Sequence, residues 1–158
     1  MIGLIQRVSE SEVWVGDQRI SSIKQGLLLL AGVAQDDEPE DVAYIAGKTV
    51  NLRIFGDEQG HLNRSLLDVK GEILVVSQFT LLGDTRKGRR PSFTRAASPR
   101  KAEHLYRLLV TELKKYNIGV KEGKFREMME VKLSNSGPVT LIIDSKVNKQ
   151  KGYKDGDH

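Results

Sequence analysis

The sequence contains no cysteine among its 158 residues, so disulfide bonds, thiol catalysis and cysteine-based zinc sites are all excluded. Histidine is also scarce: His61, His104 and His158 are the three imidazoles, and no two of them have metal-ligand spacing. The sequence also lacks a P-loop, a dinucleotide-binding fingerprint, a GxSxG nucleophile elbow and an HExxH zinc motif. We therefore expect no metal site and no cofactor.

Long hydrophobic runs are missing as well. The longest, residues 27–33, is far too short to cross a bilayer, and the starting MIGLIQRVSE lacks the charged and apolar regions of a signal peptide. These features predict a cytoplasmic protein that makes no membrane contact. The 25 Lys and Arg exceed the 21 Asp and Glu by only four charges, so the distribution of charge matters more than its total.

The apolar residues that are present follow two periodicities. Alternation in the first third predicts β-strands, and two later segments repeat their apolar residues at helical spacing, the second behind Ser98 as N-cap and Pro99 in the first turn. The predicted fold class is α+β, a barrel-like and mainly antiparallel β-sheet with two main helices in a single domain over residues 1–144. Residues 145–158 are polar and lack apolar periodicity, which predicts a disordered tail. Predicted strands cover residues 2–8, 13–15, 19–23, 26–33, 53–55, 72–79, 125–133 and 139–144, and predicted helices cover 39–52 and 99–116.

The first candidate for chemistry is the sequence SQFTL, where the apolar strand EILVV ends in Ser77, Gln78, Phe79 and Thr80. Strand ends expose functional groups, and successive backbone N–H groups there can bind an oxyanion. The alternative is a strand that simply runs into a turn, since neither hydroxyl has a base nearby in the sequence.

The second candidate is the 16-residue run RKGRRPSFTRAASPRK, residues 86–101, which holds seven cations and no acid. Charge of this kind suits a loop that binds nucleic-acid phosphates rather than one that reads bases, although a solvated basic surface is the alternative. The cations predicted to bind tRNA are Arg86, Lys87, Arg89, Arg90 and Arg95.

Two further features are unusual for their positions. Asn135-Ser136-Gly137-Pro138 divides two predicted strands and reads most simply as a turn, yet it places a proline directly against a strand. Arg7 lies within the apolar strand LIQRV, where a cation either reaches solvent from an edge or is held by specific acceptors.

Taken together, MIGLIQRV, SQFTL, RPSF and GKFREMMEVKLSNSGPVT closely resemble the D-aminoacyl-tRNA deacylase family, in the same order and over roughly residues 1–144. The resemblance implies a homodimer that hydrolyses the ester joining a D-amino acid to tRNA. It implies that the Gly137–Pro138 bond is cis and reaches into the partner's active site, and that Arg7 holds this segment in orientation. Both carbonyls of a cis bond point to one side, where they could accept hydrogen bonds from the α-amino group of only one enantiomer.

The resemblance also assigns the catalytic position. Phe79 and Thr80 would supply backbone N–H groups to the ester carbonyl, while Ser77 and Gln78 would line the pocket and help to seat the terminal adenosine. The attacking group is either the Thr80 hydroxyl or, as we favour, a water molecule assisted by the 2′-hydroxyl of the ribose. Glycyl-tRNA mischarged on tRNA(Ala) would be excluded only weakly, because glycine has no side chain to reject.

Two other functions remain open at this point. One is a noncatalytic tRNA-binding or nucleic-acid-binding module that uses the 86–101 loop, with DNA not expected as a partner. The other is a threonine- or serine-dependent hydrolase of small esters or amides, for which Thr80 would be the nucleophile.

Overall fold

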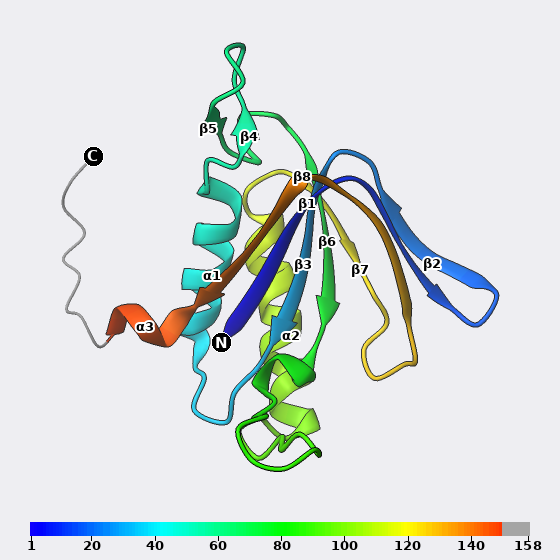
Figure 1. The fold of residues 1–158 in the computed structure, drawn as a ribbon, viewed down its shortest axis with the longest axis vertical. Helices are drawn as coiled ribbons and strands as arrows, with labels where there is room; N and C mark the ends of the chain where they lie inside the picture. Colours follow the sequence, from blue (N-terminus) through cyan, green and yellow to red (C-terminus); the bar gives the residue numbers. More distant parts are fainter. Residues whose placement is uncertain (150–158) are drawn as a thin grey trace.

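The long first strand, β1 (Ile2–Val15), organises the fold, because it pairs with three other strands. In the computed structural model, which describes residues 1–149, its first half pairs antiparallel with β3 (Gly26–Gly32) and its second half with β2 (Gln18–Ile23). The other edge of β1 pairs antiparallel with β8 (Glu130–Asp144). Figure 1 shows that β1, β2 and the start of β8 arch away from the helices, so the sheet curls strongly.

The sheet continues from β3 with two parallel strands. β6 (Glu72–Ser77) pairs with β3, and β7 (Gly119–Glu122) pairs with β6, giving the order β2-β1-β3-β6-β7 with β8 on β1. The Ser21 hydroxyl of β2 donates to the Glu122 carbonyl of β7 at 2.7 Å, which nearly closes the curl into a barrel. The predicted barrel-like α+β fold is confirmed, and the parallel β3–β6–β7 segment makes its sheet mixed.

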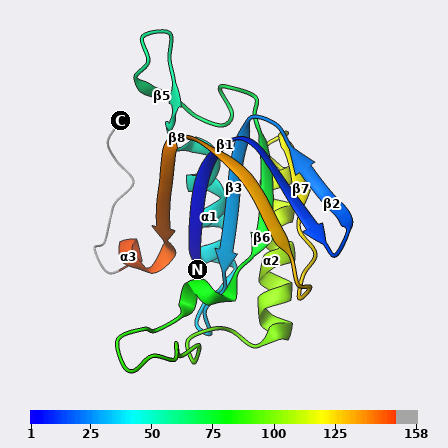
Figure 2. The same cartoon turned by 45° about the vertical axis from the view of Figure 1, so that its right-hand side comes forward.

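Two helices cover one face of this sheet, as Figures 1 and 2 show. They are α1 (Pro39–Asn51) and α2 (Pro99–Lys114), and both begin with proline where the missing N–H has no intrahelical role. The Ser98 side chain accepts a hydrogen bond from the Lys101 N–H, as expected for an N-cap.

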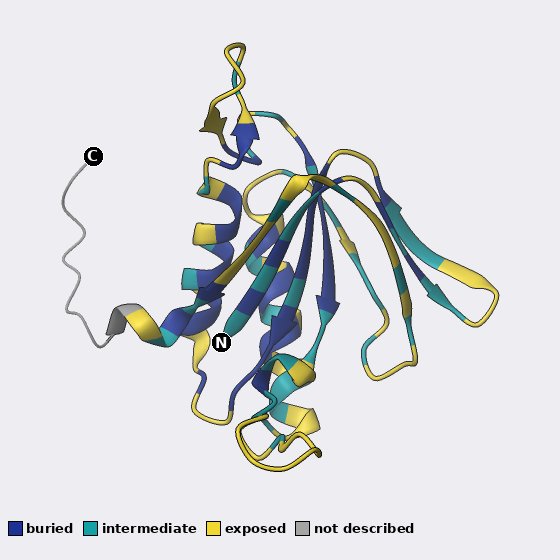
Figure 3. Cartoon of the chain, in the orientation of Figure 1, coloured by how far each residue is buried: buried dark blue, intermediate teal, exposed yellow. Residues whose placement is uncertain are grey.

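Apolar side chains form two cores on the two faces of the sheet (Figure 3). The larger lies between the sheet and the helices, where Ile45 of α1 and Leu109 of α2 are fully buried against Leu29 of β3. The smaller fills the inside of the curl. Its buried members are Val8, Val13, Ile23, Leu28, Leu74 and Val76. Burial on both faces explains why β3 and β6 are continuous apolar runs.

The structure corrects three sequence predictions. Residues 135–138 are not a turn between two strands, because β8 is one strand of 15 residues that passes through them. Residues 125–129 lie in the connection between β7 and β8 rather than in a strand. The predicted disordered tail begins with the helix α3 (Ser145–Lys149), in which Lys146 Nζ lies 3.1 Å from Asp41 Oδ2; its remainder, 150–158, lies outside the described residues.

No helix in the described part, residues 1–149, is long and apolar enough to span a membrane. Three smaller elements complete the described chain. The remaining elements are β4 (Phe55–Gly56), β5 (Leu62–Arg64) and the 3-10 helix η1 (Phe79–Leu82).

Candidate functional site

The C-terminal end of β6 passes directly into η1, and this junction forms one wall of a cavity. The Gln78 N–H donates to the Ala31 carbonyl at 2.8 Å, which continues the β3–β6 pairing for one residue beyond the strand. Phe79 and Thr80 then begin the 3-10 helix, where backbone N–H groups have no intrahelical acceptor. Gly32 permits this close approach, since a Cβ there would lie 2.6 Å from Leu82 and 3.0 Å from the Gln78 carbonyl.

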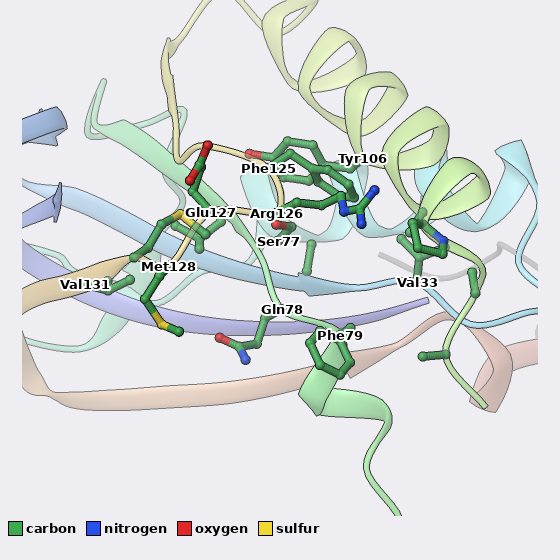
Figure 4. A pocket seen from close by; sticks show the side chains of 17 residues that line it. Val33, Ser77, Gln78, Phe79, Tyr106, Phe125, Arg126, Glu127, Met128 and Val131 are labelled. Carbon is green, nitrogen blue, oxygen red and sulfur yellow. The ribbon is translucent and has the colours of Figure 1, made fainter. Parts of the chain in front are cut away.

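The cavity has a volume of about 600 Å³ and lies between this junction, the start of α2 and the 125–129 connection (Figure 4). Its walls are mostly apolar, which suits a flat organic group such as a nucleobase. Of the four predicted catalytic residues, the structure places Ser77, Gln78 and Phe79 in the lining of the cavity, whereas Thr80 is not among its lining residues. The lining residues are Ala31, Val33, Val76, Ser77, Gln78, Phe79, Ala96, Ala97, Pro99, Ala102, Tyr106, Phe125, Arg126, Glu127, Met128, Met129 and Val131.

The Thr80 hydroxyl has the wrong partner for a nucleophile. Its Oγ1 accepts a hydrogen bond from the side-chain amide of Gln78, and an amide N–H cannot remove a proton from it. Tyr106 cannot act as the base either, because burial raises the pKa of its phenol and its O–H donates to the Val75 carbonyl at 2.9 Å. This geometry favours backbone groups and water over a side-chain nucleophile.

Arg7, Gly137 and Pro138, the residues expected to reach into the partner's active site or to orient that segment, lie away from this cavity. Arg7 donates from Nε to the Ser136 carbonyl at 2.8 Å and from Nη1 to the Ile54 carbonyl at 2.6 Å. The Gly137–Pro138 bond is cis, and Gly137 has a φ of +133°, a region accessible almost only to glycine. Arg7 is therefore a cation held by backbone carbonyls beside this segment.

Asn135 is a positioning residue that sequence reasoning missed. Its Oδ1 accepts from the Val139 N–H at 2.8 Å, and its Nδ2 donates to the Val139 carbonyl at 3.2 Å and to Thr140 Oγ1 at 3.0 Å. These bonds span the irregularity in the pairing of β8 with β1. The motif N-x-G-P-V-T includes this asparagine, but the turn-forming composition of the segment predicted a turn rather than a role for the Asn135 side chain.

Within one chain the two groups of predicted residues lie at opposite ends of the sheet (Figure 1). Asn135 pairs with Val8, which lies level with Glu72 at the start of β6, whereas the junction with η1 follows Ser77 at the end of β6. Five residues of strand separate these levels, which is roughly 17 Å at ~3.3 Å per residue. A single chain therefore does not bring Gly137 and Pro138 to Phe79 and Thr80.

The basic loop adjoins the cavity through an aromatic contact. Phe93 packs edge-on against Phe79, with ring centroids 5.1 Å apart. Arg86 makes a salt bridge with Asp84, which lowers the pKa of this carboxyl. Part of the positive charge of the loop is therefore already neutralised. Four of the predicted tRNA-binding cations remain exposed without a salt bridge among residues 1–149. They are Lys87, Arg89, Arg90 and Arg95.

Comparison with known proteins identifies the family of this chain. The family described as D-Tyr-tRNA(Tyr) deacylase matches residues 4–144, nearly the whole described chain. The chain belongs to the D-Tyr-tRNA(Tyr) deacylase family. Curated relatives in this deacylase family include the D-aminoacyl-tRNA deacylase of Thermoanaerobacter pseudethanolicus, 53% identical over 92% of this chain and 98% of the relative. The corresponding protein of Bacillus licheniformis is 54% identical over 90% of this chain and 97% of the relative.

Solved structures extend the similarity to the whole deacylase fold. A protein described as the c-Myc DNA Unwinding Element Binding Protein is 37% identical, with a TM-score of 0.86 over 91% of this chain and 98% of that one. A second structure, described as a "probable eukaryotic D-amino acid tRNA deacylase", is only 16% identical. It still superimposes with a TM-score of 0.78 over 90% of this chain and 97% of that one, which shows the shared fold.

Proposed function

We propose that this protein hydrolyses the ester bond of D-aminoacyl-tRNA, releasing the D-amino acid and free tRNA. One observation carries the proposal: in a member of this family, an apolar cavity large enough for a terminal nucleoside ends at the start of η1. The ester carbonyl would lie against the Phe79 and Thr80 N–H groups, which stabilise the negative charge that develops on its oxygen. Ser77 and Gln78 would then contact the terminal adenosine.

Water is the attacking group in this proposal. Thr80 has a hydrogen-bond donor rather than a base as its partner, so its hydroxyl is not activated. The neighbouring 2′-hydroxyl of the ribose is well placed to orient the water molecule, and an activated ester needs little further help. No metal or cofactor takes part in this scheme.

Selection of the D-enantiomer would come from a second copy of the chain. Gly137 and Pro138 are exposed and are held in place by Arg7 and Asn135, yet they lie far from the cavity of their own chain. A homodimer could bring them to the partner's cavity, where their carbonyls would accept bonds from the α-amino group. An L-amino acid would direct its side chain against this backbone, whereas glycyl-tRNA would be rejected only weakly.

The surface of β8 supports a dimer. Within the described residues β8 pairs only with β1, so its second edge is open over the length of a 15-residue strand. Three large apolar side chains on this strand are exposed, with Ile142 71% exposed. Open edges and exposed apolar residues are features that folded chains usually cover. The three are Leu133, Leu141 and Ile142.

The basic loop would bind the tRNA backbone beside the cavity. We expect Arg89→Gln with Arg90→Gln to weaken tRNA binding and to lower the slope of log affinity against log salt by about 2, because each arginine that neutralises a phosphate contributes about 1. Arg86→Gln is the matched control, because Asp84 already pairs with this arginine. Equal effects of the two changes would identify the loop as ordinary solvated surface.

A noncatalytic nucleic-acid-binding function is the second candidate. It is favoured by the 37% identical relative, whose description names a DNA unwinding element. The basic loop would serve such a protein equally well, because phosphate contacts do not distinguish RNA from DNA.

The deciding experiment compares D-tyrosyl-tRNA and L-tyrosyl-tRNA, each incubated with the protein and in an enzyme-free control. Loss of the D-ester with the L-ester spared establishes the reaction and its stereochemistry. Such a reaction would take place in the cytoplasm, where charged tRNA is used. Survival of both esters would favour the binding module. Equal cleavage of both would leave an esterase without a chiral gate.

A further inference from the structure

Arg126 has a backbone conformation that arginine seldom adopts. Its φ is +65°, in the left-handed region. It is the third residue of a turn closed by a hydrogen bond from the Glu127 N–H to the Lys124 carbonyl at 3.2 Å. Glycine or asparagine usually occupies such a position, because a larger side chain has a steric cost there. An arginine here therefore calls for a compensating role of its side chain.

The side chain extends into the cavity. Figure 4 shows Arg126 beside the Phe125 and Tyr106 rings, and all three residues line the pocket. Among the residues described, 1–149, the Arg126 guanidinium makes neither an ion pair nor a hydrogen bond. Glu127 is the other charged residue of the lining, but its carboxylate lies 3.5 Å from Lys124 Nζ. The cavity is thus lined by one cation whose charge is not matched by any residue in the described part of the chain.

We propose that Arg126 binds the phosphodiester group that links the terminal adenosine of tRNA to the preceding nucleotide. This inference rests on the proposed function and identifies a subsite for it. The amino acid's own carboxyl is esterified in the substrate, so the nearest negative charge to the terminal nucleoside is this phosphate. A guanidinium presents paired donors that match phosphate oxygens, and the positive end of α2 borders the same cavity at Pro99.

The backbone position provides a variant that separates binding from folding. Arg126→Gly removes the cation and the steric cost together, so it should leave the melting temperature equal or higher while it weakens substrate binding. Arg126→Lys should retain part of the binding, since it keeps the charge and loses the paired geometry. Lys70→Gly is the matched control: Lys70 is also an exposed cation with a positive φ, of 51°, but it lies outside the cavity.

The test uses D-tyrosyl esters of an RNA minihelix whose last internucleotide link is either a phosphodiester or an uncharged methylphosphonate. We expect the wild type to show a KM about tenfold higher for the methylphosphonate substrate, as for the loss of one charge-assisted bond. Arg126→Gly should raise the KM for the phosphodiester by a similar factor, leave that for the methylphosphonate unchanged, and leave kcat nearly unchanged for both.

The outcomes separate the subsite from the reaction itself. If the wild type leaves both esters intact, the proposed function fails and this inference fails with it. If the wild type cleaves both esters, but Arg126→Gly raises both KM values equally or neither, the reaction stands and the phosphate subsite is overturned. The subsite is also overturned if Lys70→Gly reproduces the effect.

Discussion

The two ends of the sheet use backbone and side-chain groups differently. We call them the cavity end, at residues 77–80, and the Gly-Pro end, at Gly137 and Pro138. At the cavity end, side chains such as Tyr106 and Phe125 form apolar walls, and the start of η1 offers backbone N–H groups. At the other end the side chains of Arg7 and Asn135 bind backbone groups of β8 and hold an exposed segment in place. Among the described residues, neither end has a side chain activated as a nucleophile. In the proposed reaction, both ends would therefore depend on how accurately the backbone is held.

The largest effect is expected from Gly137→Ala, which breaks the Gly-Pro end alone. An added Cβ would lie 2.8 Å from Arg7 Nη2 and 2.9 Å from Val139 Cγ2, in a backbone conformation closed to alanine. We expect hydrolysis of D-tyrosyl-tRNA to fall by about 10²-fold, because a displacement of roughly 1 Å has consequences of this size. Steady-state kinetics with a thermal melt distinguishes this from unfolding.

Gly16→Ala provides the control for strain without displacement. Gly16 also has a positive φ, of 56°, but nothing lies within 4 Å of an added Cβ. It should lose some stability and keep its activity. Full activity in Gly137→Ala would mean that the Gly-Pro end takes no part in the reaction.

Asn135→Ala should have the next largest effect, because it removes three hydrogen bonds that hold the same segment. We expect about a tenfold loss of D-ester hydrolysis and a reduced preference for the D-enantiomer. Asn135→Asp keeps the acceptor for the Val139 N–H and loses the donors. Its rate of D-ester hydrolysis should therefore lie between those of the wild type and Asn135→Ala. Asn51→Ala, which removes one exposed bond within α1, is the control and should change neither measurement.

The contrast between the two ends also explains what the sequence could predict. Both helices and the buried strands were predictable because their signals are local, repeating along β3 or behind the Ser98 cap. The path of β8 was not, since Arg7, 129 residues from Ser136, stabilises a strand through residues that normally form turns. The β7 strand was missed because four half-exposed or exposed residues owe their strand conformation to pairing with β6.

The same reasoning applies to the site. SQFTL was recognisable from local pattern as a strand end, but only the family resemblance implied that Ser77 and Gln78 line a pocket, as they do in the structure. The role proposed for Arg126 was not predictable, because it rests on a positive φ and on a cavity assembled from distant segments. Residue type alone describes it as one more surface cation.

Thr80→Ala tests whether the cavity end works through its backbone. The substitution removes the hydroxyl but leaves the N–H, so we expect activity within about tenfold of the wild type. Thr80→Val, which has nearly the same shape, should behave alike. A loss of about 10⁴-fold or more in single-turnover assays, the size seen when a true nucleophile is removed, would overturn the water route.

The smallest effect is expected from Tyr106→Phe, which changes a wall of the cavity without touching the backbone groups proposed to react. It removes the bond to the Val75 carbonyl and should cost about 1 kcal/mol of stability at pH 7, or roughly 2–4 °C in melting temperature. Burial raises the pKa of this phenol in the folded protein, so the unfolded chain loses the proton first as pH rises above about 10. Wild-type stability should therefore fall there more steeply than that of Tyr106→Phe, and the difference in stability between the two proteins should narrow. Tyr116→Phe, at an exposed position two residues beyond the end of α2, should leave stability at pH 7 unchanged. If the stability difference between the wild type and Tyr106→Phe stayed constant up to about pH 11, the fold would not hold Tyr106 protonated. Tyr106 would then have to be reconsidered as a group of the cavity wall that can titrate.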